Sequence, residues 1–291
     1  MYQDFSKCKL SNINYGGSER KLGILINEEP YMLKFQKDTP FGKRYNHISE
    51  FLGSHIFQML GLKTHETYLG YYKNEEVVAC KDFVNKGYMF VPFNDVGEST
   101  IDEDINNFQY SYEDILSLLE MNKKLTNVNE TISTFFDMYI VDALIGNFDR
   151  HGSNWGFLKH DNKYILAPIF DNGSCFFPQL TDDNEIRKIM DDEDELNRRI
   201  YTFPTSQIKL DNKKSSYYQV ISSLKFEECN NALKRIYPRI DLNKINNIID
   251  LLKISDVHKQ FYKKILLLRY EKIIKYSYEL LMEKNKYEKY N

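Results

Sequence analysis

The spacing of apolar residues changes part-way along this chain of 291 residues, and that change limits the possible folds more than any other feature. Up to about residue 86, short apolar runs between turn signals predict β-strands at 21–26, 31–35, 66–72 and 76–84. One stretch among them, 46–60, has helical spacing and is followed by Gly61. Beyond residue 87 helical spacing dominates. This order predicts an α+β fold of two lobes, a small strand-rich lobe at 1–86 and a larger helical lobe at 87–291.

The second lobe is predicted to be helical apart from one hairpin. Its helices are expected at 112–122, 130–145, 224–236, 242–252 and 257–282. Two short apolar runs, 155–158 and 164–169, would form the hairpin. The stretch from about 181 to 215 is acidic and polar, which predicts a long surface segment. Its acidic runs are more simply explained as a solvated face than as a cation site.

Composition argues against several functional classes. The net charge of −3 and the pI of about 6.1 leave no global basic field, so direct binding to nucleic acid is not expected. The four cysteines lie far apart without a C-x-x-C pair, and the six histidines form no H-x-x-x-H pattern, which argues against zinc. No apolar run reaches the ~18 residues of a membrane span, and the N-terminus does not have the pattern of a signal peptide. We therefore expect a cytoplasmic protein without membrane contact, with secretion or delivery to a host left open.

The most informative segment is the polar loop 146–154, which follows the predicted helix 130–145. Phosphoryl transfer needs an acid that accepts the proton of the attacking hydroxyl, and oxygen ligands that hold Mg²⁺ on the nucleotide phosphates. Asp149 and Asn154 have the D-x-x-x-x-N spacing that supplies the acid and one metal ligand. His151 lies between them, where it would orient the loop backbone or approach the γ-phosphate.

Three other charged residues would complete this site. Asp171 follows an apolar strand and precedes a turn, in the place of a D-F-G motif, and would be the main Mg²⁺ ligand. Lys34 lies inside an apolar strand, where a buried ammonium needs a partner. Glu50 on the following helix can be that partner. In kinases, a strand lysine paired with a helix glutamate holds the α- and β-phosphates of ATP.

The remaining contacts to ATP are expected from backbone groups. Gly16, Gly17 and Ser18 precede the first predicted hairpin and would cover the phosphates through their N–H groups. The adenine would hydrogen-bond to the backbone of a hinge between the lobes. We expect this hinge at Lys81, Asp82, Phe83 and Val84.

Each of these features has a simpler explanation when it is taken alone. The D-x-x-x-x-N spacing arises by chance in many chains, D-N-G is commonly a plain turn, and a strand lysine often lies at an edge with its head in water. Their order along the chain, however, is that of a kinase. Two alternatives stay open: a nucleotide-binding regulator without catalysis that holds a partner protein, and a kinase of small molecules or lipids.

Several of these segments resemble the HipA-type serine/threonine kinases, which have a protein-kinase-like fold. The resemblance covers nearly the whole chain and is strongest for the short, single-unit CtkA-like branch. It rests on Asp149-Arg150-His151 with Asn154, Phe170-Asp171, Gly17-Ser18, Ser49-Glu50, and the segments 31–35 and 79–83. Phosphoinositide kinases share the D-R-H-x-x-N block, so this block does not by itself define the substrate.

The resemblance implies phosphorylation of serine or threonine on proteins, with ATP and Mg²⁺. It also implies autophosphorylation, at Ser18 of the glycine loop, and often a toxin role with a separate antitoxin protein. Full-length HipA proteins carry an additional N-terminal subdomain that this chain is too short to hold, so antitoxin contacts through that subdomain do not simply carry over. A phosphate on Ser18 would add roughly −1.5 to −2 charges beside the triphosphate, and we expect it to lower the affinity for ATP.

Overall fold

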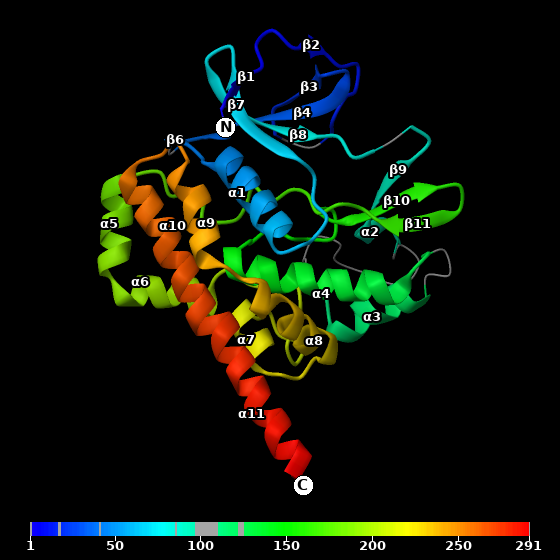
Figure 1. Ribbon diagram of the computed structural model, residues 1–291, viewed down its shortest axis with the longest axis vertical. Helices are drawn as coiled ribbons and strands as arrows, with labels where there is room; N and C mark the ends of the chain where they lie inside the picture. Colours follow the sequence, from blue (N-terminus) through cyan, green and yellow to red (C-terminus); the bar gives the residue numbers. More distant parts are fainter. Residues whose placement is uncertain are drawn as a thin grey trace.

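The computed structural model describes residues 2–16, 19–40, 42–84, 86–96, 110–121 and 125–290. Within this part of the chain, a strand-rich lobe lies above a larger helical lobe (Figure 1). The predicted α+β fold of two lobes is therefore confirmed. The N-terminus lies at the sheet of the upper lobe, and the C-terminus lies at the far end of the lower lobe.

The upper lobe is built on a six-stranded sheet with the strand order β1-β7-β8-β4-β3-β2. Its strands are β1 (Gln3–Asp4), β2 (Lys9–Leu10), β3 (Lys21–Ile26), β4 (Glu29–Phe35), β7 (Thr67–Tyr72) and β8 (Glu75–Lys81). Strand β1 lies parallel to β7, and the other neighbours are antiparallel. A two-residue turn with positive φ connects the strands of each hairpin. Asn27 and Glu28 form the turn between β3 and β4, and Lys73 and Asn74 form the turn between β7 and β8. Such turns match the twist of the strands that they connect.

Lys34 lies on the face of this sheet that packs against helix α1 (Asn46–Met59). Successive side chains of a strand point to opposite faces. Leu33 belongs to a small core of the upper lobe, whereas Lys34 is paired across the sheet with Val78, which belongs to the main core together with α1. The strand register therefore places one ammonium group between sheet and helix, and Figure 1 shows α1 directly below the sheet. A small two-stranded sheet, β5 (Asp38–Thr39) with β6 (Gly42–Lys43), connects β4 to α1.

Helix α4 (Val128–Ile145) forms the centre of the lower lobe. It begins after Asn127, whose side-chain oxygen accepts a hydrogen bond from the backbone N–H of Glu130. It ends at Gly146, whose φ of 65° is typical of a left-handed C-terminal cap. Every residue from 138 to 145 is buried, so the last two turns of α4 are enclosed on all sides. The polar loop that follows therefore starts from a rigid base.

Shorter helices surround α4, and α8 and α10 pack directly against it. They are α2 (Phe93–Val96), α3 (Tyr112–Met121), α5 (Asp183–Asp191), α6 (Glu193–Asn197), α7 (Tyr217–Ser222), α8 (Glu227–Ile236), α9 (Leu242–Asp250), α10 (Asp256–Arg269) and α11 (Tyr276–Tyr290). The 3₁₀ turn η2 (Tyr237–Arg239) follows α8, and the π-helical turns η1 (Arg198–Thr202) and η3 (Tyr270–Lys275) follow α6 and α10. Figure 1 shows these helices around and below α4.

A three-stranded sheet lies beside the helices, with the order β11-β10-β9. Strands β10 (Gly156–His160) and β11 (Lys163–Leu166) form the predicted hairpin. Strand β9 (Met89–Pro92), which was not predicted, pairs with β10 soon after the chain has left the upper lobe. The two strands approach closely at Gly156, where a Cβ atom would lie 2.3 Å from the carbonyl oxygen of Val91.

The stretch 181–215 differs from the predicted surface segment. It folds into α5, α6 and η1, which bury Ile186, Ile189, Leu196 and Ile200. One of its acidic residues caps a helix: Asp182 accepts hydrogen bonds from two backbone N–H groups at the start of α5. These helices are short and contain few apolar residues, so the sequence pattern did not predict them.

The last predicted helix, 257–282, is also not one regular element. The π-helical turn η3 separates α10 from α11, and Figure 1 shows α11 extending beyond the lower lobe. Arg269 lies at the end of α10 and is fully buried. Its Nε donates to the carbonyl oxygen of Ala143, 2.7 Å away in the last turn of α4, and its Nη1 donates to the carbonyl oxygen of Arg199 at 2.5 Å.

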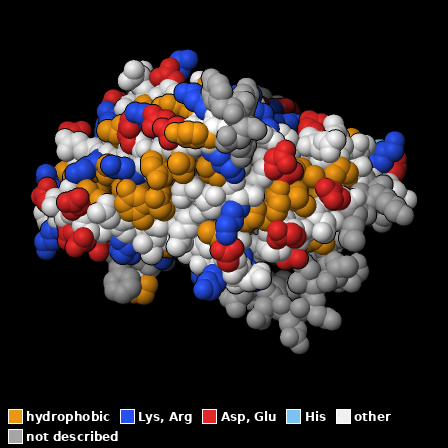
Figure 2. Space-filling model, turned by 90° about the horizontal axis from the view of Figure 1, so that it is seen from below, with side chains coloured by type: hydrophobic (Ala, Val, Ile, Leu, Met, Phe, Trp, Pro, Cys, Tyr) orange, Lys and Arg blue, Asp and Glu red, His pale blue; other side chains and the backbone are white. Residues whose placement is uncertain are grey.

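The surface of the described residues carries mixed charge. Figure 2 shows Lys and Arg side chains intermingled with Asp and Glu side chains over the lower face, with hydrophobic patches between them. This pattern agrees with the small net charge of the sequence. Among the described helices, no helix has both the length and the apolar character needed to cross a membrane.

We predict that the free energy of unfolding depends strongly on the end of α4. Leu144 is fully buried there, so Leu144→Ala is expected to lower the free energy of unfolding by about 2–5 kcal/mol through lost burial and a cavity. Leu267→Ala is a matched control, because the Leu267 side chain is 48% exposed. Urea unfolding followed by circular dichroism measures both, and equal effects of the two variants would contradict the assignment of this core.

Candidate active site

A cavity of about 380 Å³ lies between residues of the two lobes. The upper lobe supplies residues of β3, β4 and α1, and the lower lobe supplies the loop after α4 and the segment after β11. Its lining comprises Glu19, Lys21, Lys34, Lys37, Arg44, Asn46, Glu50, Phe148, Asp149, His151, Asn154, Asp171, Gly173, Ser174 and Pro178. The structure thus brings together six predicted charged or polar groups from distant parts of the chain, Lys34, Glu50, Asp149, His151, Asn154 and Asp171.

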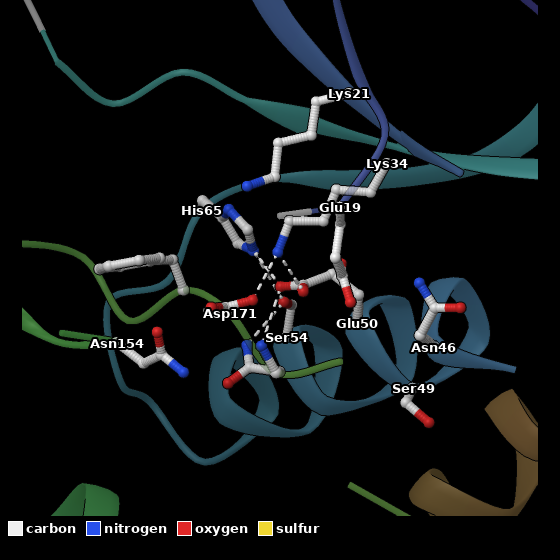
Figure 3. A network of polar contacts seen from close by, with 12 residues as sticks. Glu19, Lys21, Lys34, Asn46, Ser49, Glu50, Ser54, His65, Asn154 and Asp171 are labelled. Atoms are coloured by element: carbon white, nitrogen blue, oxygen red, sulfur yellow. Dashed lines mark hydrogen bonds and ion pairs between the residues drawn. The ribbon is translucent and has the colours of Figure 1, made fainter. Parts of the chain in front are cut away.

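Lys34 lies at the centre of the ionic contacts in this cavity. Its Nζ is 2.7 Å from Oε2 of Glu50 and 2.7 Å from Oδ1 of Asp171 (Figure 3). Burial alone would favour the neutral amine, but the charges of Asp171 and Glu50 outweigh it and raise the pKa of Lys34 well above its usual value. The predicted pairing of Lys34 with Glu50 is therefore present, and Lys34 is a stable cation between two carboxylates.

Glu50 is buried on α1 and uses both of its carboxylate oxygens. Oε2 accepts from Lys34, while Oε1 accepts from the backbone N–H of Asn172 at 3.0 Å and lies 3.0 Å from Nε2 of His65. Burial raises the pKa of a carboxyl group, but the Lys34 charge and the contact with His65 lower the pKa of Glu50 below its ordinary value. Glu50 is therefore ionised and connects the upper lobe to the segment that follows Asp171.

The loop after α4 is fixed by hydrogen bonds within itself. The side-chain amide of Asn147 donates to Oδ1 of Asp142 on α4, and its oxygen accepts from the backbone N–H of Asp149 at 3.1 Å. Nδ2 of Asn154 donates to the carbonyl oxygen of Asp149 at 2.7 Å. The two predicted polar residues of the D-x-x-x-x-N spacing therefore hold each other in place, with Asp149 and Asn154 both lining the cavity.

Asp149 is flanked by His151, whose Nε2 lies 3.5 Å from Oδ1 of Asp149. Burial raises the pKa of the Asp149 carboxyl group, the interaction with His151 lowers it, and the negative charge of Asp171 raises it. The net result is a pKa above the usual value for aspartate. Nδ1 of His151 accepts from the backbone N–H of Ser153 at 3.3 Å, so the ring is also tied to the loop backbone.

Arg150 had no predicted role, although it lies between two predicted residues. Its guanidinium is buried and pairs with Asp142, with Nε 2.9 Å from Oδ2. Nη1 donates to the carbonyl oxygens of Asn154 at 3.0 Å and Phe170 at 2.5 Å. Arg150 therefore joins α4, the loop and the segment that carries Asp171. No sequence motif shows these contacts, because they are made across the fold.

Asp171 has an unusual backbone conformation for an aspartate. Its φ is 57°, in the left-handed region that non-glycine residues rarely adopt. Asp171 lies five residues after the end of β11, and its carboxylate is directed toward Lys34. In Figure 3 the amide oxygen of Asn154 lies on the side that faces Asp171.

The oxygen atoms of Asn154 and Asp171 fit a magnesium ion. Mg²⁺ prefers hard oxygen ligands, is usually held by one or two carboxylates, and takes its remaining ligands from water and phosphate. Nδ2 of Asn154 is already bonded to the loop backbone, which leaves the amide oxygen as the group that would hold the ion with the carboxylate of Asp171.

The predicted hinge lies beside this cavity, although Lys81, Asp82, Phe83 and Val84 are not among its described lining residues. The ring of Phe83 packs against the ring of Phe170, next to Asp171, with centroids 5.3 Å apart. Lys81 instead points away to form an ion pair with Glu29 at 2.8 Å.

The glycine loop is described only in part. Gly17 and Ser18 lie outside the described residues. Gly16, the residue before them, accepts a hydrogen bond from Nζ of Lys21 at its carbonyl oxygen. Tyr15 donates its hydroxyl proton to Oδ2 of the hinge residue Asp82 at 2.9 Å. The segment that leads into the loop is therefore held next to the hinge.

The model of the HipA-like C-terminal domain family matches residues 13–250. The chain belongs to this family. It is 40% identical to the serine/threonine-protein kinase CtkA of Helicobacter pylori strain J99 over 290 residues, which cover 96% of this chain and 89% of the relative. The crystal structure of a Helicobacter pylori proinflammatory kinase CtkA superimposes with a TM-score of 0.89 at 39% identity, and covers 97% of this chain and 98% of that chain.

A more distant structure shows the same fold. HipA of Shewanella oneidensis MR-1, solved in a toxin–antitoxin complex with HipB and operator DNA, superimposes with a TM-score of 0.60 at 17% identity. The match covers 94% of this chain and 68% of that chain. The predicted HipA-type, CtkA-like resemblance is confirmed, and the chain is a HipA-like enzyme of the serine/threonine-protein kinase class.

We predict that Arg150 stabilises the lower lobe as well as the loop. Arg150→Met would leave the buried carboxylate of Asp142 without its cation, and is expected to lower the free energy of unfolding by about 3–5 kcal/mol. Arg198→Met is the matched control, because Arg198 is 52% exposed and its ion pair with Glu195 is expected to contribute below about 1 kcal/mol. A shift in the urea midpoint of Arg150→Met no larger than that of the control would refute this role.

Proposed function

We propose that the protein transfers the γ-phosphoryl group of ATP, with Mg²⁺, to serine or threonine hydroxyls of proteins. The observation that carries this proposal is the convergence of Lys34, Asp149, Asn154 and Asp171 on one cavity. The name of the CtkA relative, serine/threonine-protein kinase, supports a protein as the acceptor.

Each of these four residues has a separate role in the proposed reaction. Lys34, held by Glu50, would bind the α- and β-phosphates, and Lys21 adds a second cation on the same side of the cavity. Asp149 would orient the acceptor hydroxyl and accept its proton. Asn154 and Asp171 would hold Mg²⁺, which neutralises charge on the phosphates when it is bound.

The adenine would lie at the hinge. Phe83 and Phe170 form an apolar surface next to Asp171, and the backbone of Lys81, Asp82, Phe83 and Val84 would supply the hydrogen bonds. Gly16, Gly17 and Ser18 would close over the phosphates. In this arrangement the adenine, the phosphates and the acceptor follow one another from the hinge toward Asp149.

Two other activities remain to be separated from this proposal by experiment. A nucleotide-binding regulator would bind ATP and hold a partner protein without transfer, and a small-molecule or lipid kinase would transfer to a different acceptor. The ionised, paired Lys34 and the positioned Asp149 favour transfer over binding alone. Labelled ATP with the purified protein, a protein acceptor and, in parallel, lipid and small-molecule acceptors distinguishes all three.

We predict different losses for the two aspartates. Asp149→Asn is expected to lower turnover by about 10²–10⁴-fold, because it removes the proton acceptor, and to leave ATP binding within about twofold since the metal ligands remain. Asp171→Asn is expected to lose Mg²⁺-dependent nucleotide binding as well. Turnover and calorimetric titration with ATP, each with and without Mg²⁺, test both variants. Asp161→Asn, an exposed change in the turn between β10 and β11, is the control.

The result that would count against these roles is specific. Normal turnover of Asp149→Asn would remove Asp149 as the base. Unchanged Mg²⁺-dependent binding of ATP by Asp171→Asn would remove Asp171 as the main ligand.

We further propose that Ser18 is autophosphorylated and that this modification lowers activity. A phosphate there would repel the nucleotide phosphates and compete for the same N–H donors. Mass spectrometry of protein incubated with ATP is expected to find phosphate on Ser18, and to find none in Asp149→Asn. Phosphate that is absent from the active protein, or equal in both proteins, would contradict self-modification at this residue.

A toxin role is a further proposal, and it concerns the cell and not the reaction. The structure of HipA that shares the fold was solved with HipB in a toxin–antitoxin system. We propose that this kinase acts in the cytoplasm, where its four unpaired cysteines stay reduced, and that a separate protein can restrain it. Growth after induction of the parent and of Asp149→Asn tests this role, since only the parent should slow growth.

A further inference from the structure

Asn172, directly after the proposed metal ligand Asp171, is fully buried and connects three elements of the fold. Its backbone N–H donates to Oε1 of Glu50 at 3.0 Å, and its Nδ2 donates to Oγ of Ser54 at 2.9 Å, both on α1. Its Oδ1 accepts from Nη2 of Arg150 in the loop after α4, at 2.5 Å. The reaction proposed above assigns no role to this residue.

These bonds surround a strained position. Asp171 has a φ of 57°, and such a conformation in a non-glycine residue is strained and persists only where its surroundings fix it. The residues on both sides of Asp171 are held by the same guanidinium, because Arg150 donates from Nη1 to the carbonyl oxygen of Phe170 and from Nη2 to Asn172. Asn172 connects the same segment to α1 through its hydrogen bonds to Glu50 and Ser54.

Helix α1 approaches this segment closely at Gly53. A Cβ atom on Gly53 would lie 2.7 Å from Cβ of Asn172, so the helix can come this near only with glycine at that position. An apolar side chain of the same size as Asn172 would fill the space, but Nη2 of Arg150 would lose one of its acceptors. A buried donor without a partner is unfavourable, so an amide suits this place better than a hydrocarbon.

We propose that Asn172 is a positioning residue that couples the orientation of the Asp171 carboxylate to the position of α1. Glu50 accepts from Lys34 at one oxygen and from Asn172 at the other, so a movement of α1 that breaks the ion pair also releases the segment of Asp171. The role of the metal in this inference rests on the proposed function. The coupling itself is a property of the protein without ligands.

The first experiment uses the protein without nucleotide or metal. Asn172→Leu removes both side-chain hydrogen bonds and keeps the branching at Cγ, and Asn247→Leu, at an exposed position of α9, is the matched control. Hydrogen exchange measured by mass spectrometry is expected to show faster exchange of the peptide that contains residues 171–173 in Asn172→Leu only, because the segment opens more often. Unchanged exchange there would overturn the coupling.

The second experiment measures metal dependence. Residues that orient a metal ligand typically change metal affinity or activity by about 10- to 100-fold, and we expect the Mg²⁺ concentration for half-maximal turnover of Asn172→Leu to rise by this amount. ATP affinity without Mg²⁺ is expected to stay within about twofold, because Lys34 and Glu50 remain. A loss of general structure would weaken both quantities together, and that result would overturn a positioning role.

A milder variant keeps the test decisive if Asn172→Leu does not fold. Ser54→Ala removes one acceptor of the Asn172 amide and is expected to shift exchange and Mg²⁺ dependence in the same direction by a smaller factor. When both variants fold, we combine Asn172→Leu with Ser54→Ala in a double variant. Its changes in exchange rate and in Mg²⁺ dependence should be smaller than the product of the two single changes, since both substitutions break the same connection. A parent enzyme that needs no Mg²⁺ would contradict the proposed function, whereas unchanged exchange in both variants would contradict this inference alone.

Discussion

The buried ammonium of Lys34 is the constraint on which the rest of the site depends. An ammonium taken out of water is stable only with close and well-placed negative charge. Its two partners come from different places, Glu50 from the helix below the sheet and Asp171 from the lower lobe. The charge is therefore satisfied only when the sheet, the helix and the lower lobe are assembled together. The assembly of the two lobes and the ionised state of Lys34 therefore depend on each other.

Much of this arrangement could be predicted because its physical causes act over short stretches of the sequence. The spacing of apolar residues predicted the two strands of the first hairpin and α1, with ends that differ from the observed ends by at most two residues. A lysine inside an apolar strand needs a partner, and Glu50 on the next helix was the partner predicted for it. The spacing of Asp149 and Asn154 is likewise local, since both lie in one loop. Such features are visible because their physical cause acts within a few residues.

The features that could not be predicted depend on contacts across the fold. Arg150 and Asn172 are adjacent to predicted residues, yet only the folded chain shows that they meet each other and α1. Strand β1, two residues long, forms by pairing with β7, 67 positions later (Gln3 with Gly70), and leaves no periodic pattern. The helices of 181–215 are stabilised by the few side chains that they bury against α10. In each case tertiary contacts, and not local propensity, decide the structure.

Arg269 shows that residues near the C-terminal end of the chain help to hold the structure around Asp149. The match to the model of the HipA-like C-terminal domain family ends at residue 250, but Arg269, nineteen positions beyond it, donates to the carbonyl oxygen of Ala143, just before the loop of Asp149. A protein shortened to residues 13–250 would lose this donor at the end of α4. The part of the chain beyond the matched family domain therefore contributes to the structure around Asp149.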